Sequence, residues 1–270
     1  MILVGLIIFI FGLAIGSFLN VVIERTREKK EIIFARSSCP KCQKKIKWYD
    51  NIPLISFFLL AGRCRFCHQK IAWQYFFVEL VTGILFLINF GVGWSRIGEI
   101  NFDLLINLIN GWVIISFLVI IFLYDLKYYL ILDRFIWPAV ISVVFFQFFL
   151  VKQNQGSMIN GGQDFLVHLL CGIIIGSFFA LQYFLTSGRG VGGGDMRMGF
   201  LMGLILGWPL SLAGLFLAYI IGLLIAVPLL MTKKKGWGSV LPMGTFLSLA
   251  TLIVFWWGDL LLKWYWSLIS

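Results

Sequence analysis

Long stretches without a charged residue recur along almost the whole chain, and they limit what it can fold into. A helix needs about 20 apolar residues to cross the hydrocarbon core of a bilayer. Only 13% of the 270 residues are charged and 60% are hydrophobic, whereas an ordinary soluble domain carries about 25% charged residues. A soluble fold would lack the polar residues to cover so much apolar surface. The sequence therefore predicts an all-α integral membrane protein, a bundle of about eight transmembrane helices.

The expected helices divide the chain into three parts. The first segment, 1–23, lacks the basic start and the A-x-A site of a cleaved signal peptide, so we expect a retained transmembrane helix. A polar cytoplasmic loop follows over 24–73, and the remaining bundle covers 74–270. The expected spans after the first are 74–93, 103–124, 134–151, 165–186, 197–210, 212–231 and 241–263.

The distribution of Lys and Arg predicts the orientation of these helices. If the chain starts outside, 19 of its 22 Lys and Arg fall in inner segments, and three fall outside: Arg96, Lys152 and Lys263. Cytoplasmic loops of membrane proteins carry this excess of positive charge. We therefore expect both termini outside and the loop 24–73 in the cytoplasm. The net charge of +10 then belongs to loops beside the bilayer, and we do not expect nucleic acid as a partner.

Four cysteines in the loop 24–73 form two CxxC pairs, CPKC (39–42) and CRFC (64–67), with 21 residues between them. Two such pairs about twenty residues apart are typical of a structural zinc site, because each turn offers two thiolates on one side. Four sulfurs complete a tetrahedral shell and leave no position for a catalytic water. The spacing predicts a zinc ion bound by Cys39, Cys42, Cys64 and Cys67.

Two other interpretations of these cysteines stay open. A pair of disulfides would need an oxidising compartment, which the expected cytoplasmic location does not provide. The run CRFCH (64–68) also matches a haem-attachment pentapeptide, but this would leave the other CxxC pair unexplained. We expect His68 at the surface, or at most as a substitute ligand. The fifth cysteine, Cys171, lies in an apolar helix and is expected in the core.

Two carboxylates, Asp125 and Asp195, are predicted to lie at the same depth. Asp125 ends the third expected span, which runs inward, and Asp195 precedes the sixth, which runs outward, so both reach the cytoplasmic face. Two carboxyl groups at hydrogen-bonding distance titrate as a pair, and one then holds a proton while the other acts as a base toward water. The glycines before Asp195, including Gly192 and Gly194, allow the backbone to approach closely.

Position and charge alone also allow a structural role for these acids. Each aspartate would then cap a helix end or pair with Lys127 or Arg197. For His168, in the fifth expected helix, we expect a polar contact between helices rather than a role as catalytic base.

Five segments carry a resemblance to a known family. They are GSFLNVVIER (16–25), the stretch from RSSCPKC to FFVELVTG (36–83), Asp125 with ILD (131–133), GVGGGDMRMG (190–199) and LPMGTFLSLA (241–250). Together they resemble the bacterial prepilin peptidases, membrane aspartic proteases of the GxGD type that process type IV pilins and related pseudopilins.

The resemblance implies that Asp125 and Asp195 are the catalytic pair, with Gly192 and Gly194 in the active-site loop and Asp133 in a structural or secondary role. It implies cleavage of a short basic leader, after a glycine, at the cytoplasmic face of the bacterial inner membrane. Many members also methylate the new amino terminus with S-adenosylmethionine, an activity linked to the cysteine loop. No residues for a methyl-donor site are assigned here.

The chain departs from the family pattern at a few positions. Leu132 stands where a proline usually precedes the second acid of the first motif, and Thr26-Arg27 replaces a proline after the first helix. Met243 and Thr245 stand where phenylalanine and proline are common. These changes concern local turn geometry and remove neither a carboxylate nor a cysteine.

Three rival functions remain beside a peptidase that is also a methyltransferase. The first is a peptidase without methyltransferase activity. The second is a proton-coupled transporter, which would place acids near the bilayer midplane on interrupted, repeat-related helices. The third is a zinc-ribbon scaffold without catalysis.

Overall fold

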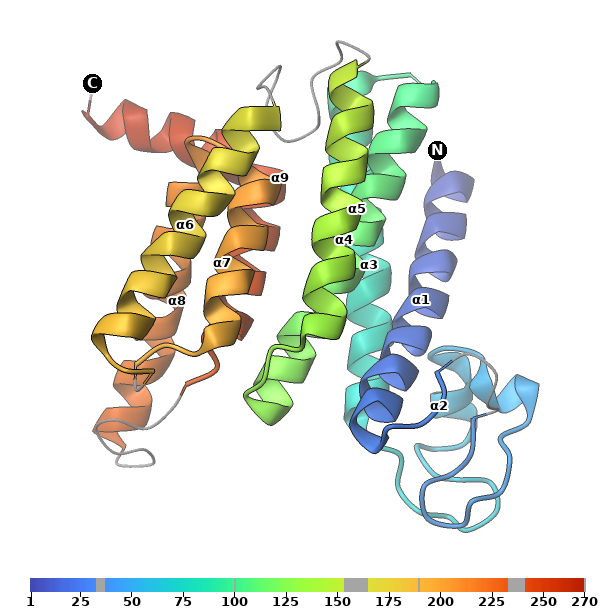
Figure 1. Ribbon diagram of the computed structural model, residues 1–270. Coiled ribbons are helices and arrows are strands. Elements are labelled where there is room, and N and C mark those ends of the chain that lie inside the picture. Colours follow the sequence, from blue (N-terminus) through green and yellow to red (C-terminus); the bar gives the residue numbers. More distant parts are fainter. Residues whose placement is uncertain (33–36, 100, 153–164, 189, 233–240, 270) are drawn as a thin grey trace. The chain divides into compact units, whose positions relative to one another are not determined.

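The computed structural model describes residues 1–32, 37–99, 101–152, 165–188, 190–232 and 241–269, and this part of the chain is helical (Figure 1). Its two isolated antiparallel bridges, Ser38 with Lys45 and Arg63 with Lys70, lie in the loop between the first two long helices. The short elements of that loop are η1 (Trp48–Asn51) and α2 (Ile55–Leu59). The long helices are α1 (Ile2–Glu28), α3 (Trp73–Ile97), α4 (Phe102–Tyr128), α5 (Asp133–Lys152), α6 (Phe165–Leu185), α7 (Gly193–Leu206), α8 (Leu210–Met231) and α9 (Met243–Ile269).

Each of the expected spans corresponds to one of these long helices. Within the described residues, six helices have the length and hydropathy to cross a bilayer: α1, α3, α4, α6, α8 and α9. The chain is therefore a multi-pass membrane protein. Helix α7 has only 14 residues, about 21 Å at 1.5 Å per residue, which is shorter than the roughly 30 Å hydrocarbon core.

Helix ends differ from the expected ones at two places that matter for the acids. Helix α4 continues to Tyr128, so Asp125 lies one turn before its end; Tyr129 then takes a left-handed conformation with φ of 57° and ends the helix. Helix α7 begins at Gly193, so Asp195 lies inside its first turn, and it ends before Gly207, whose φ is 64°.

The chain divides into two compact units, Met1–Trp94 and Ser95–Ser270. In the first unit, α1 and α3 approach closely at small residues: a Cβ on Gly12 would lie 2.8 Å from the Gly83 Cα, and a Cβ on Gly16 would lie 2.8 Å from the Glu79 Cα. The buried Asn20 amide also donates to the Tyr75 carbonyl oxygen at 3.3 Å. Small residues allow such close packing where lipid gives no hydrophobic drive between helices.

The second unit is built from helices that pack around α7. This helix contacts α5, α6, α8 and α9, and α4 packs against α5 and α9. Figure 1 shows α6 and α7 side by side. Met198, Leu201, Met202, Leu204 and Leu206 of α7 are fully buried, so this short helix is the centre of the unit. The three-part division expected from the sequence stays a prediction.

We predict that a methyl group added between α6 and α7 destabilises the second unit. A Cβ on Gly203 would lie 2.5 Å from the Cys171 carbonyl oxygen, whereas a Cβ on Gly91 has open space around it. Overpacking costs about 1–3 kcal/mol, so Gly203→Ala should lower the melting temperature in detergent. The control Gly91→Ala should leave the melting temperature unchanged or raise it slightly, because alanine is more favourable than glycine inside a helix. Equal melting temperatures for the two variants would contradict this packing.

Candidate active site and metal centre

The two CxxC pairs of the first unit form turns with the same backbone hydrogen bonds. The Cys39 N–H donates to the Lys44 carbonyl at 3.0 Å, and the Cys64 N–H donates to the Gln69 carbonyl at 2.8 Å. In each turn, the residue after the second cysteine closes back onto the first cysteine's carbonyl, and these residues, Gln43 and His68, both have φ of 54°. The two turns are therefore equivalent, with an offset of 25 residues along the sequence.

These turns bring four sulfurs together. The Sγ atoms of Cys39, Cys42, Cys64 and Cys67 all lie within 4.8 Å of one another, and those of Cys39 and Cys67 are 3.8 Å apart. A tetrahedral site with metal–sulfur distances of about 2.3 Å would place its sulfurs about 3.8 Å apart. The donor set and its spacing thus fit a metal ion. The sulfurs belong to free cysteines, and His68 is not part of the cluster.

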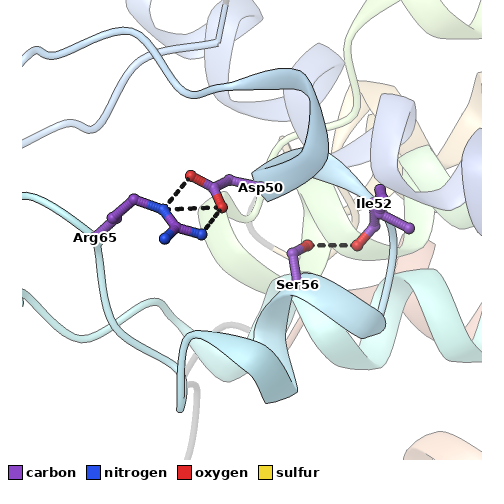
Figure 2. A network of polar contacts seen from close by, with 4 residues as sticks. All are labelled: Asp50, Ile52, Ser56 and Arg65. Carbon is purple, nitrogen blue, oxygen red and sulfur yellow. Dashed lines mark hydrogen bonds and ion pairs between the residues drawn. The ribbon is translucent and has the colours of Figure 1, made fainter.

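An ion pair connects the second turn to η1 (Figure 2). The Arg65 Nε donates to Asp50 Oδ2 at 2.8 Å and the Arg65 Nη2 donates to Asp50 Oδ1 at 2.5 Å. These hydrogen bonds and the positive charge of Arg65 hold the pKa of Asp50 below its usual range. Beside the pair, the Ser56 hydroxyl donates to the Ile52 carbonyl and closes the start of α2. Both contacts order the chain between the two cysteine turns.

Asp125 lies buried in the last turn of α4, with 4% of its surface exposed. Its Oδ2 accepts a hydrogen bond from the Thr245 backbone N–H at 2.8 Å and lies 3.1 Å from the Thr245 hydroxyl. The donors belong to the first turn of α9. Backbone N–H groups of a first helical turn have no partner within their helix, and they favour a negative charge.

Asp195 lies in the first turn of α7, with 9% of its surface exposed. Its Oδ2 accepts a hydrogen bond from the Gly192 N–H at 2.9 Å, and its own N–H donates to the Gly192 carbonyl at 3.0 Å. This is the helix-capping role that the sequence left open for the acids. It involves only one of the two carboxylate oxygens, so it does not exclude a second role.

Ile131 brings the two acidic positions together. A Cβ on Gly194, next to Asp195, would lie 2.8 Å from the Ile131 Cβ. A Cβ on Gly244, next to Thr245, would also clash with Ile131, and it would lie 3.0 Å from Asp125 Oδ2. Both glycines thus pack against one side chain of the α4–α5 connection. The carboxyl groups of Asp125 and Asp195 therefore lie at helix ends that meet around Ile131.

Arg197 does not form the ion pair with Asp195 that the sequence left open. Arg197 pairs with Asp133 rather than with Asp195, and its Nε donates to the Gly193 carbonyl at 3.1 Å. Asp133 and Arg197 therefore connect the start of α5 with the start of α7. Sequence reasoning gave Asp133 a secondary role, but it missed Ile131 and the two donors of Thr245.

The expectations for His168 and Cys171 are confirmed. His168 of α6 is buried, and its Nδ1 lies 3.0 Å from the Gln147 Nε2 and 2.9 Å from the Leu204 carbonyl oxygen. It is a contact between α5, α6 and α7, as expected. Cys171 is buried in α6.

Comparison with known proteins identifies the family of this chain. The model for the bacterial Peptidase A24 N-terminal domain matches residues 10–92, and the model for the type IV leader peptidase family matches residues 112–227. A prepilin leader peptidase/N-methyltransferase of Vibrio cholerae is 33% identical over 76% of this chain and 78% of the relative. The chain belongs to the type IV leader peptidase family.

Relatives of the same printed name match almost end to end. One from Bacillus subtilis is 29% identical over 96% of this chain and 96% of the relative, and one from Aeromonas salmonicida is 28% identical over 97% and 94%. No solved structure matches the chain. Membership in this family of membrane proteases confirms the resemblance drawn from the sequence motifs.

We predict that the four sulfurs bind one metal ion per chain. Cys64→Ser should lower the metal content of the purified protein far below that of the wild type, because the site loses a thiolate ligand. Cys171→Ser is the control: it also removes a thiol, but from α6 rather than from the cluster. Elemental analysis measures both. An unchanged metal content in Cys64→Ser would refute the metal centre.

Proposed function

We propose that this protein cleaves the leader peptide of type IV prepilins or pseudopilins, with Asp125 and Asp195 as an aspartyl dyad. One observation carries the proposal: two buried carboxyl groups, 70 residues apart in sequence, lie at neighbouring helix ends within one unit. The names of the relatives, prepilin leader peptidase/N-methyltransferase, support this choice of substrate.

The chemistry requires one protonated and one ionised carboxyl group. Two neighbouring carboxyl groups do not both ionise easily, so the pair holds one proton. The ionised group removes a proton from water, and the water oxygen attacks the carbonyl carbon of the scissile peptide bond. The protonated group polarises the carbonyl oxygen, and a proton passes to the leaving nitrogen as the carbon–nitrogen bond breaks. Thr245 donates to the Oδ2 of Asp125 and Gly192 to the Oδ2 of Asp195, and we propose that the Oδ1 atoms face water and substrate.

The proposed position in the membrane agrees with this substrate. The bias of Lys and Arg supports a cytoplasmic side for the loop 24–73 and for the ends of α4 and α7 that carry the acids, with both termini outside. In the bacterial inner membrane, a prepilin with a basic leader and an apolar stem would present its scissile bond at the cytoplasmic interface. The dyad would lie at that depth.

The cysteine cluster is proposed to bind zinc in a structural role. Four thiolates suit zinc among the metals common in proteins, and a closed shell provides no open position for catalysis. Zinc would replace the apolar core that a loop of this size and polarity lacks. No step of the peptidase reaction depends on it.

We also propose that the protein methylates the amino terminus that cleavage releases, with S-adenosylmethionine as donor. The printed names of the relatives favour this second activity, and the chain retains the whole cysteine loop. The rival reading as a transporter is less well supported, because Asp125 and Asp195 lie in terminal helical turns rather than at the middle of interrupted helices.

The dyad predicts the effect of two substitutions. Asp125→Asn and Asp195→Asn should each lower the rate of prepilin cleavage in detergent by about 100- to 10,000-fold, because each removes an acid–base group. Asp259→Asn, at an exposed aspartate of α9, should cleave at the wild-type rate. Full activity in either dyad variant, with melting temperature unchanged, would contradict the assignment.

Methyl transfer can be separated from cleavage with a substrate that is already cut. We expect labelled S-adenosylmethionine to label the wild-type product of an intact prepilin. Asp125→Asn should label only a pre-cleaved prepilin, because it cannot release the amino terminus itself. If neither the wild type nor the variant labels pre-cleaved prepilin, the protein is a peptidase without this second activity.

A further inference from the structure

Thr245 makes an unusual pair of contacts with Asp125. Its backbone N–H and its hydroxyl lie 2.8 Å and 3.1 Å from the same oxygen, Asp125 Oδ2. Both residues are 4% exposed, so little water competes for that oxygen. The hydroxyl also lies 3.4 Å from the Phe122 carbonyl oxygen, but the carboxylate is the nearer and more strongly negative acceptor.

Two features of the chain allow these contacts. Thr245 lies in the first turn of α9, where the backbone N–H groups point out of the helix toward an acceptor. Gly244 allows the start of α9 to approach, since a Cβ at this position would lie 3.0 Å from Asp125 Oδ2.

The two acids differ in the donors that they receive. Asp125 Oδ2 faces two donors of Thr245, whereas Asp195 Oδ2 accepts from the single N–H of Gly192. Thr245 therefore holds the Asp125 oxygen with two donors at once. Of the other charged groups at these helix ends, Asp133 and Arg197 are paired with each other; Lys127 and Arg134 lie in the last turn of α4 and the first turn of α5.

We propose that Thr245 is a positioning residue that fixes the Asp125 carboxylate by its Oδ2, so that Oδ1 faces the attacking water. This inference rests on the proposed aspartyl mechanism. Thr245 does not touch the substrate in this account; it acts through Asp125. Its loss should therefore slow the chemical step without weakening substrate binding.

The test compares two threonines of the same helix. Thr245→Val removes the hydroxyl but keeps the shape of the side chain and the backbone N–H. It should lower kcat about 10- to 100-fold, the effect of losing a hydrogen bond to a charged group, and leave KM unchanged. Thr245→Ser, which keeps the hydroxyl, should restore kcat. The control is Thr251→Val: Thr251 is also buried, but its hydroxyl donates to the Leu247 carbonyl of its own helix at 2.7 Å, so kcat should not change.

Several results would overturn the inference. A wild-type kcat in Thr245→Val, an equal loss of kcat in Thr251→Val, or a Thr245→Ser variant as slow as Thr245→Val would each do so. If Thr245→Val does not fold, Thr245→Ala removes the same hydroxyl without adding bulk and gives the same comparison. Failure of the aspartyl mechanism gives a different result. If that mechanism is wrong, Asp125→Asn cleaves normally; if only the role of Thr245 is wrong, Asp125→Asn stays inactive and Thr245→Val cleaves normally.

Discussion

The hydrogen bonds that the start of α9 gives to Asp125 are the interaction on which the site of the second unit depends. A carboxylate buried in a membrane bundle is costly unless donors surround it. The first turn of α9 supplies them with its backbone N–H and the Thr245 hydroxyl. The N–H of Gly192, the residue before α7, does the same for Asp195. Helix termini thus make buried acids tolerable in this unit.

The packing of α7 determines where these helix termini lie. This helix is short and its apolar side chains are fully buried, so its first turn lies inside the unit rather than in a loop. A Cβ at Gly194 or Gly244 would clash with Ile131. A larger residue at either position would therefore move apart the helix ends that carry the acids. In the first unit, by contrast, few of the described side chains in the loop between α1 and α3 are buried. Four cysteine sulfurs lie close together there in place of an apolar core. A cysteine cluster that can hold a metal ion and helix packing in the second unit are two ways to order polar sequence.

Much of this could be predicted from the sequence because the signals are local. Apolar length predicted each long helix, the CxxC spacing predicted the cysteine cluster, and the glycine-flanked position of Asp195 singled it out. The donors of Thr245, the contact of Ile131 and the pair of Asp133 with Arg197 could not be predicted in the same way. Each depends on segments far apart in sequence that meet only through helix packing. Threonine and isoleucine carry no charge pattern that would mark them, and the first turn of α7 was expected to begin after Asp195 rather than before it.

The most direct test of the dyad uses a prepilin leader analogue in which a secondary alcohol replaces the scissile peptide bond. Its hydroxyl would occupy the place of the attacking water between Asp125 and Asp195. A group that mimics the transition state strengthens binding by about 100-fold or more. We expect such a gain in affinity for the wild-type protein over an analogue without the hydroxyl, and its loss in Asp125→Asn. Equal affinities of the two analogues for the wild type would contradict a dyad that activates water.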